Sequence, residues 1–251
     1  LARRLLVVCG RGNNGGDGYV VARFARAAGL QVVLAAPAGA PAGGDAERAA
    51  AEWAAGGGTV EPWSAALVHD AEVIVDALLG IGLDRDVDGE LAAVIAALNA
   101  SGRPIVALDV PSGLDSDTGW PRGLAVRAAL TVSFVGLKPG CLLGLGPEHV
   151  GRLVCDDLDV PAAAFAGAVP HLARVTDAQL RAALPRRART SHKGVHGRVL
   201  VIGGGPGMPG AVRLAGEAAL RAGAGLVTVA TWPEHAATIA AARPELICIG
   251  V

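Results

Sequence analysis

The sequence lacks the cysteine spacing of a metal site or a disulfide framework. It contains four cysteines, Cys9, Cys141, Cys155 and Cys248, and no two are close enough in sequence to form a ligand pair. Cys9 lies in an apolar run that is typical of a strand. We therefore expect these cysteines to be buried, reduced thiols of a cytoplasmic protein.

Long apolar runs and an excess of charge of either sign are also absent. Ala and Val make up most of the 52% hydrophobic content, and no uninterrupted run reaches the length of about 18 residues that a membrane span needs. The net charge of −1 argues against a nucleic-acid partner bound by phosphate neutralisation. The chain begins Leu1-Ala2-Arg3-Arg4 without Met or a signal peptide, so we expect a truncated reading frame and neither membrane nor nucleic acid as partner.

Asparagine and lysine are scarce. Two of the three asparagines are adjacent, Asn13 and Asn14, and only Lys138 and Lys193 are lysines among 22 basic residues. An Arg-rich chain keeps lysine mainly where a compact charge or a titratable amine is required. The alternatives are that Asn13 and Asn14 only accommodate a left-handed turn, and that the two lysines persist by chance.

The two asparagines lie in a glycine-rich stretch, Gly10 to Gly18, that follows the apolar run 5–9 and precedes a helical pattern at 19–26. Gly10, Gly12 and Gly15 have the G-x-G-x-x-G spacing of a dinucleotide-binding turn. The next predicted strand, 31–36, ends without the acid that would bind a ribose. Asp17 is expected to cap the helix and to compete there with a phosphate, which argues against a simple phosphate cradle.

Strands and helices alternate through the first 160 residues. The pattern predicts further strands at 72–79, 104–110 and 129–135, and helices at 45–55 and 89–100. This alternation predicts an α/β fold with a three-layer, Rossmann-like, doubly wound parallel sheet.

Polar residues gather at the ends of the predicted strands, where ligands bind in open α/β sheets. They are Asn14, Asp76, Asp109, Ser112 and Lys138. Each alone could be a capping or turn residue. Five at one edge favour a site.

A second strand and glycine loop begin at Gly197, and Gly205, Gly207 and Gly210 repeat the G-x-G-x-x-G spacing. A helix is predicted at 211–222 and a strand at 226–230. About 80 residues are few for a domain. We therefore predict one domain at 1–168 and the truncated start of another at 169–251.

Four ordered motifs resemble the NAD(P)H-hydrate epimerase family. They are Gly12-Asn13-Asn14-Gly15-Gly16-Asp17-Gly18, Val75 to Gly82, Leu108-Asp109-Val110-Pro111-Ser112-Gly113-Leu114-Asp115, and Lys138-Pro139-Gly140. The tail, from His192-Lys193-Gly194 through Gly203-Gly204-Gly205 to Leu226, resembles the opening of the ADP-dependent NAD(P)H-hydrate dehydratase, which has a ribokinase-like fold. Two parts of these families lack counterparts here: the helical segment that usually precedes the first epimerase strand, and most of the dehydratase. The resemblance therefore implies an epimerase and a non-functional dehydratase remainder.

The resemblance also implies roles for individual residues. It implies acid–base work by Asp109 with Lys138 as its partner, and a potassium ion on Asn14, Asp76 and Ser112. It implies contacts between the substrate, hydrated NADH or NADPH, and these residues: Asn13, Asn14, Gly15, Gly16, Asp17, Gly80, Ile81, Gly82, Leu83, Asp84, Arg85, Asp86 and Asp109. On the dehydratase side it implies a substrate contact at Ala211, with ADP or ATP as the cofactor of a complete domain.

Two other functions stay open. A dinucleotide-binding oxidoreductase fits the glycine loops, although the ribose-binding acid is missing after both second strands. A non-catalytic binding protein on the same fold is the other alternative, since some relatives are partners of lipoproteins. The sequence leaves open the preferred cofactor and the oligomeric state, a homo-oligomer included.

Overall fold

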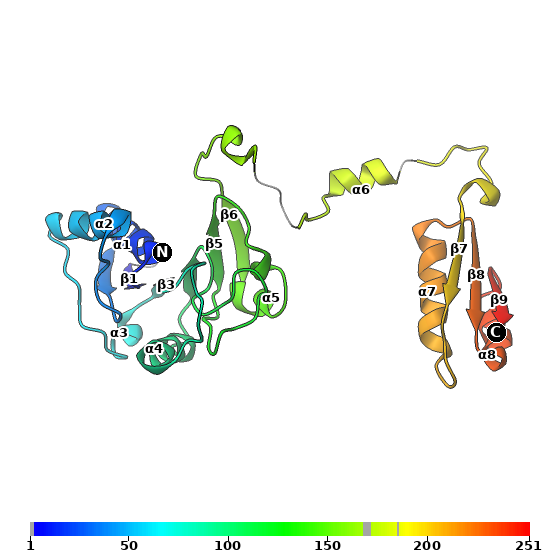
Figure 1. The fold of residues 1–251 in the computed structure, drawn as a ribbon, viewed down its shortest axis with the longest axis horizontal. Helices are drawn as coiled ribbons and strands as arrows, with labels where there is room; N and C mark the ends of the chain where they lie inside the picture. Colours follow the sequence, from blue (N-terminus) through cyan, green and yellow to red (C-terminus); the bar gives the residue numbers. More distant parts are fainter. Residues whose placement is uncertain (1–2, 168–171, 185) are drawn as a thin grey trace. The chain divides into compact units, whose positions relative to one another are not determined.

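The computed structural model describes residues 3–167, 172–184 and 186–251. The chain divides into two compact units, Leu1–Leu172 and Ala173–Val251 (Figure 1). The predicted domain boundary at 168/169 lies outside the described residues. None of the described helices is long and apolar enough to cross a membrane.

Unit 1 contains a six-stranded parallel sheet with the order β2-β1-β3-β4-β5-β6. The strands are β1 (Arg4–Cys9), β2 (Gln31–Ala35), β3 (Val73–Ala77), β4 (Ile105–Leu108), β5 (Leu130–Phe134) and β6 (Arg152–Asp156). The helices are α1 (Asn13–Ala27), α2 (Gly44–Ala55), α3 (Leu67–Asp70), α4 (Gly89–Ala100) and α5 (Gly146–Val150), with short 3₁₀ turns at Pro139–Cys141 and Ala162–Phe165. The prediction of a doubly wound parallel sheet is confirmed.

The sheet of unit 1 has a core on each face. Successive residues of a strand point to opposite faces, so Val7 lies in one cluster with residues of α1 and α2, and Leu6 and Val8 lie in the other with residues of α4. The three buried residues of α4 on that second face are Val94, Ile95 and Leu98. These two cores explain why the strands consist of nearly continuous apolar runs.

The order in which the chain adds strands to the sheet changes side at β1. The chain leaves β1 to form β2 on one side and returns to form β3 on the other, so the loops after β1 and β3 diverge at the carboxyl edge of the sheet. Ligand sites of open α/β sheets lie at such a switch point. The two loops are the glycine-rich stretch at 10–12 and the segment that begins at Leu78.

Unit 2 is a smaller α/β unit with a three-stranded parallel sheet, β7-β8-β9. Its elements are α6 (Asp177–Ala183), a 3₁₀ turn at Lys193–Val195, β7 (Arg198–Ile202), α7 (Pro209–Ala222), β8 (Leu226–Thr231), α8 (Pro233–Ala242) and β9 (Leu246–Gly250). Its core is a cluster around Val212, Val227, Val229, Ile239 and Leu246.

Two sequence expectations are wrong. Helix α1 begins at Asn13 with Gly12 as its N-cap and no side-chain cap, so Asp17 lies inside the helix and does not cap it. Of the four cysteines, Cys9 and Cys141 are buried, but Cys155 is exposed and Cys248 is only partly buried. Cys155 is exposed because β6, an edge strand, is largely uncovered.

Candidate active site

An ion pair between Asp109 and Lys138 lies at the carboxyl edge of the sheet. Asp109 directly follows β4 and has a φ of 64°, a left-handed conformation that is rare for a residue other than glycine. The N–H of Val110 donates to the carbonyl of Leu108 at 2.8 Å, which closes a three-residue γ-turn around Asp109. This turn redirects the carboxylate from the strand toward the neighbouring end of β5.

A matching turn follows β5. Val135 has a φ of 65°, and the N–H of Gly136 donates to the carbonyl of Phe134 at 2.7 Å. The N–H of Phe134 donates to Asp109 Oδ1 at 3.1 Å, and Lys138 Nζ donates to Asp109 Oδ1 and to the Phe134 carbonyl, the latter at 2.8 Å. The main chain of Phe134 therefore holds both members of the ion pair. Both are mostly buried, so water screens the pair only weakly.

A second polar cluster is buried beside the first turn of α1. Ser112 Oγ lies 2.6 Å from Asp76 Oδ1, and the Ser112 N–H donates to Oδ2 of the same carboxylate at 2.8 Å. Asn14 Nδ2 donates to the Leu79 carbonyl at 2.7 Å, and the Leu79 N–H donates to Ser112 Oγ at 2.8 Å. The three residues predicted to bind potassium are thus joined through the backbone of Leu79.

This cluster has unbalanced charge and an unused acceptor. Asp76 is fully buried and pairs with no basic side chain among the described residues. Burial raises the pKa of Asp76 to about 6, and the hydrogen bonds from Ser112 and Leu78 act in the opposite direction. Asn14 Oδ1 is buried without a hydrogen-bond partner. A carboxylate, a hydroxyl and a free amide oxygen fit a hard cation.

A cavity of about 540 Å³ separates the loop after β1 from the loop after β3. Most of the predicted substrate residues line it: Asn13, Asn14, Asp17, Gly80, Ile81, Gly82, Leu83, Asp84, Arg85 and Asp109. Partial desolvation raises the pKa of Asp17, and the charge of Asp109 adds to this increase. The cavity therefore brings together residues from three separate segments, and their binding roles stay predictions.

Four predicted residues lie elsewhere. A Cβ at Gly15 would lie 1.9 Å from the Gly10 carbonyl oxygen, and a Cβ at Gly16 would lie 2.8 Å from Ala46 Cα, so both glycines are needed for packing. Asp86 lies on the second loop but does not line the cavity. Ala211 is exposed in the first turn of α7, in unit 2.

The cavity also includes residues that the sequence analysis did not select. Arg11, Gly12, Ala38, Leu78, Leu79 and Leu91 line it. Arg11 lies between two glycines of the motif, and this position could have identified it. Leu79 acts through its backbone carbonyl and N–H, which leave no signature in an apolar run.

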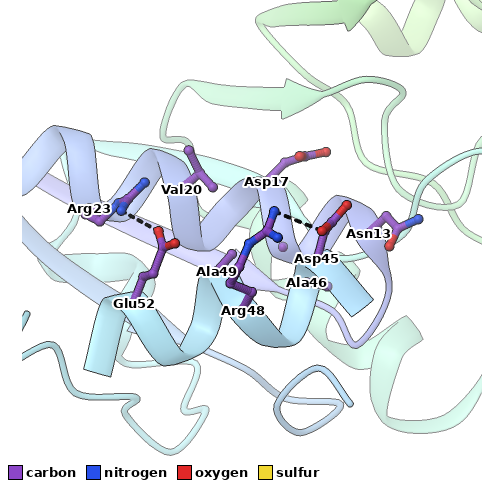
Figure 2. A pocket seen from close by; sticks show the side chains of 10 residues that line it. Asn13, Asp17, Val20, Arg23, Asp45, Ala46, Arg48, Ala49 and Glu52 are labelled. Carbon is purple, nitrogen blue, oxygen red and sulfur yellow. Dashed lines mark hydrogen bonds and ion pairs between the residues drawn. The ribbon is translucent and has the colours of Figure 1, made fainter. Parts of the chain in front are cut away.

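A second groove lies between α1 and α2 and shares Asn13 and Asp17 with the cavity (Figure 2). Its volume is about 480 Å³. Its basic residues already have acidic partners: Arg23 pairs with Glu52, and Arg48 lies 2.9 Å from Asp45. Within the described residues no group of three or more His, Cys, Asp or Glu side chains is placed to bind a metal.

Residues 1–140 match the family model described as YjeF-related protein N-terminus, which is more than half of the chain. The chain belongs to the YjeF_N family. Residues 199–251 of this YjeF_N protein match a second family model, described as NAD(P)H-hydrate dehydratase. Sequence of both families is therefore present, and the expectation of a non-functional dehydratase remainder gains no support from these matches.

Curated relatives align along nearly the whole chain. The bifunctional NAD(P)H-hydrate repair enzyme Nnr of Coxiella burnetii is 45% identical over 98% of this chain and 51% of its own length. The enzyme of the same name from Escherichia coli is 44% identical over 98% of this chain and 48% of its own length. The chain thus spans about half the length of these relatives.

A solved structure supports the fold alone. The crystal structure of yeast ynu0, YNL200c, superposes with a TM-score of 0.56 at 24% sequence identity. It covers 70% of this chain, and 75% of the yeast chain is covered.

Proposed function

We propose that unit 1 interconverts the R and S epimers of hydrated NADH and NADPH. The observation that supports this most strongly is the Asp109–Lys138 pair, because Asp109 also lines the cavity between the two loops. The names of the relatives and the membership in the YjeF_N family agree with this activity.

The epimers differ at one carbon that bears a hydroxyl beside the ring nitrogen. Inversion requires either loss of hydroxide to a planar iminium and its return to the other face, or opening of the ring to an aldehyde and its closure. Both routes move a proton at the hydroxyl oxygen. Asp109 Oδ1 accepts from Lys138 and Phe134, while Oδ2 has no hydrogen-bond partner within the described part of the chain. Oδ2 is therefore the oxygen that exchanges this proton, and Lys138 stabilises the charge on the carboxylate.

We also propose that Asn14, Asp76 and Ser112 hold an alkali cation, potassium by family resemblance. The unpartnered Asn14 Oδ1 and the buried, unpaired Asp76 support this assignment. A cation there would supply the positive charge that Asp76 lacks and would fix the two loops against each other.

Unit 2 supports a second candidate function. Its match to the dehydratase family favours a part in the ADP-dependent dehydration of the same substrate, with Ala211 near the bound ligand. The test is to incubate the S epimer with ADP and the protein and to follow recovery of the reduced cofactor by absorbance. Recovery that does not exceed a blank without protein would contradict this function for the chain.

The epimerase proposal is tested by following R-to-S conversion with wild-type protein and with Asp109→Asn. The substitution keeps the volume and removes the carboxylate, so we expect conversion to fall by about 10²–10⁴-fold while the melting temperature is maintained. Unchanged conversion in a folded Asp109→Asn protein would exclude Asp109, and no conversion by wild type would exclude the activity. The expected location is the cytoplasm, testable by fractionation of cells that express the protein.

A further inference from the structure

The cavity is lined by three carboxylates and two arginines. Asp17, Asp84 and Asp109 line it, and its basic lining residues are Arg11 and Arg85. Neither arginine forms an ion pair within the described residues, whereas Asp109 already has Lys138. A ligand with a pyrophosphate carries two negative charges. It therefore needs these arginines, with its reacting ring at Asp109 and its phosphates away from it.

Neither the backbone conformation nor the packing of the protein requires glycine at position 12. Its φ of −90° and ψ of −168° suit any residue, and a Cβ built there has no protein atom within 4 Å. By contrast, a Cβ at Gly10 would lie 1.8 Å from the Leu78 carbonyl oxygen. Gly12 faces the cavity, as does Gly82, whose Cβ would also meet open space. Glycine at such positions leaves room for a ligand close to the main chain.

The start of α1 lies at the same place. Gly12 is its N-cap, no side chain caps it, and its first turn contains no acidic residue. The N–H groups in the first turn of this 15-residue helix have no side-chain cap, and such groups attract an anion. Asp17 lies inside the helix and does not cap it, so its carboxylate does not occupy this end of α1 in place of a phosphate.

We infer that Arg11 is a specificity-determining residue, and that it binds a phosphate group of the hydrated dinucleotide together with the main chain at Gly12. This rests on the proposed function for the identity of the substrate. The phosphate is either part of the pyrophosphate or the 2′-phosphate of the NADP form. A guanidinium fits both through two parallel hydrogen bonds. The α1–α2 groove is the weaker candidate because Arg23 and Arg48 are paired with acids there.

The test compares Arg11→Gln with Arg48→Gln, a matched loss of one exposed arginine beside α1. Binding of ADP-ribose and of 2′-phospho-ADP-ribose is measured by titration calorimetry, and KM and kcat are measured for both hydrated cofactors. Arg11→Gln should weaken binding by about tenfold or more and raise KM while kcat changes little. Arg48→Gln should change neither, and Arg11→Lys should restore part of the binding.

The two ligands identify which phosphate is bound. A loss with both ligands places the pyrophosphate at Arg11, and a loss with 2′-phospho-ADP-ribose alone places the 2′-phosphate there; each supports the inference. Gly12→Ala should weaken the same ligand with an unchanged melting temperature. Unchanged affinity in Arg11→Gln, or an equal loss in Arg48→Gln, would overturn it. Because ADP-ribose lacks the reacting ring, this result is independent of whether the protein epimerises anything.

Discussion

The two units begin with the same local pattern, a strand followed by a glycine loop and a helix, yet their surroundings differ. In unit 1, Val7, Val8 and Cys9 of β1 are completely buried, whereas in unit 2 Leu200 and Ile202 of β7 are 58% and 74% exposed. In unit 1 two glycines of the spacing are tightly packed: Gly10 lies against Leu78, and Gly15 lies against Gly10. In unit 2, Cβ atoms at Gly207 and Gly210 would meet no protein atom within 4 Å.

This difference shows that the G-x-G-x-x-G spacing alone does not build a site. In unit 1 the loop is fixed because a second loop, after β3, packs on it and supplies the Leu79 carbonyl to Asn14. The chemistry then comes from still other segments, at Asp109 and Lys138. A local motif becomes a site where neighbouring strands bring further groups to the same edge of the sheet.

The largest expected contrast is in core packing. Ile95→Ala removes a fully buried side chain of unit 1 and should lower the free energy of unfolding of that unit by about 2–5 kcal/mol. Ile202→Ala makes the same change at an exposed position of unit 2 and should cost less than about 0.5 kcal/mol. Urea unfolding of both variants measures the difference. Equal costs would mean that Ile202 is buried in solution.

The next contrast concerns buried charge. Asp76 is fully buried in unit 1, whereas the buried polar residue described in unit 2 is the neutral Thr231. The pKa of Asp76 is raised from 3.8 to about 6, so between about pH 4 and 6 its carboxyl is uncharged in the folded protein and ionised in the unfolded chain. As the pH rises from about 4 to 6, ionisation should cost about 3 kcal/mol of stability unless a cation offsets it.

Potassium should therefore raise the melting temperature of unit 1 at pH 8, on the order of 5 °C, and much less at pH 4.5. Thermal melts in potassium chloride and in choline chloride at matched ionic strength measure this effect. In Asp76→Asn the difference between the two salts should disappear. An equal potassium effect at both pH values would contradict a cation bound to Asp76.

The sequence predicted the parts of the fold that depend on local patterns. The helix at 89–100 has the predicted bounds, and the buried strands match their apolar runs to within about two residues. Strand β6 was not predicted, because Arg152–Asp156 is a mostly exposed edge strand without the apolar run of a buried one. Helix α8 was also not predicted.

The candidate site was predictable as an edge of the sheet but not as a geometry. The position of Asp109 after a strand was visible in the sequence. Its pairing with Lys138 depends on left-handed turns at Asp109 and Val135, where no glycine signals them. The prediction that Asp17 caps α1 was wrong for a related reason: the N-cap is Gly12, which has no side chain that could signal it in the sequence.

Backbone strain gives a smaller contrast between the units. Within the described residues, those other than glycine with positive φ are Asp109, Val135, Leu158 and Asp159, all in unit 1, whereas in unit 2 only glycines have it. Val135→Gly should relieve strain of about 1 kcal/mol and leave stability unchanged or higher. The matched change in a regular strand, Val154→Gly, should destabilise by about 1 kcal/mol.

The Val135→Gly substitution should also make the neighbouring Phe134 more mobile, and the main chain of Phe134 holds both Asp109 and Lys138. We therefore expect kcat for epimerisation to fall several-fold in Val135→Gly while KM is maintained. Val154→Gly should leave kcat unchanged, because Val154 contacts neither member of the pair through a hydrogen bond. A loss of stability in Val135→Gly equal to that in Val154→Gly would contradict strain at this turn.

The smallest contrast between the units concerns the reactivity of their thiols. Burial raises the pKa of Cys9 strongly and that of Cys141 to about 11, so both should resist an aromatic disulfide reagent at pH 8. Cys155 is exposed and should react first, and the partly buried Cys248 of unit 2 should follow more slowly, since burial raises its pKa as well. Cys9 and Cys141 are buried and become reactive only when unit 1 opens.

In Ile95→Ala the labelling of Cys9 should accelerate while that of Cys248 keeps its rate, as mass spectrometry of the labelled peptides can show. Equal acceleration at Cys9 and Cys248 would mean that the two units unfold together and would contradict their independence.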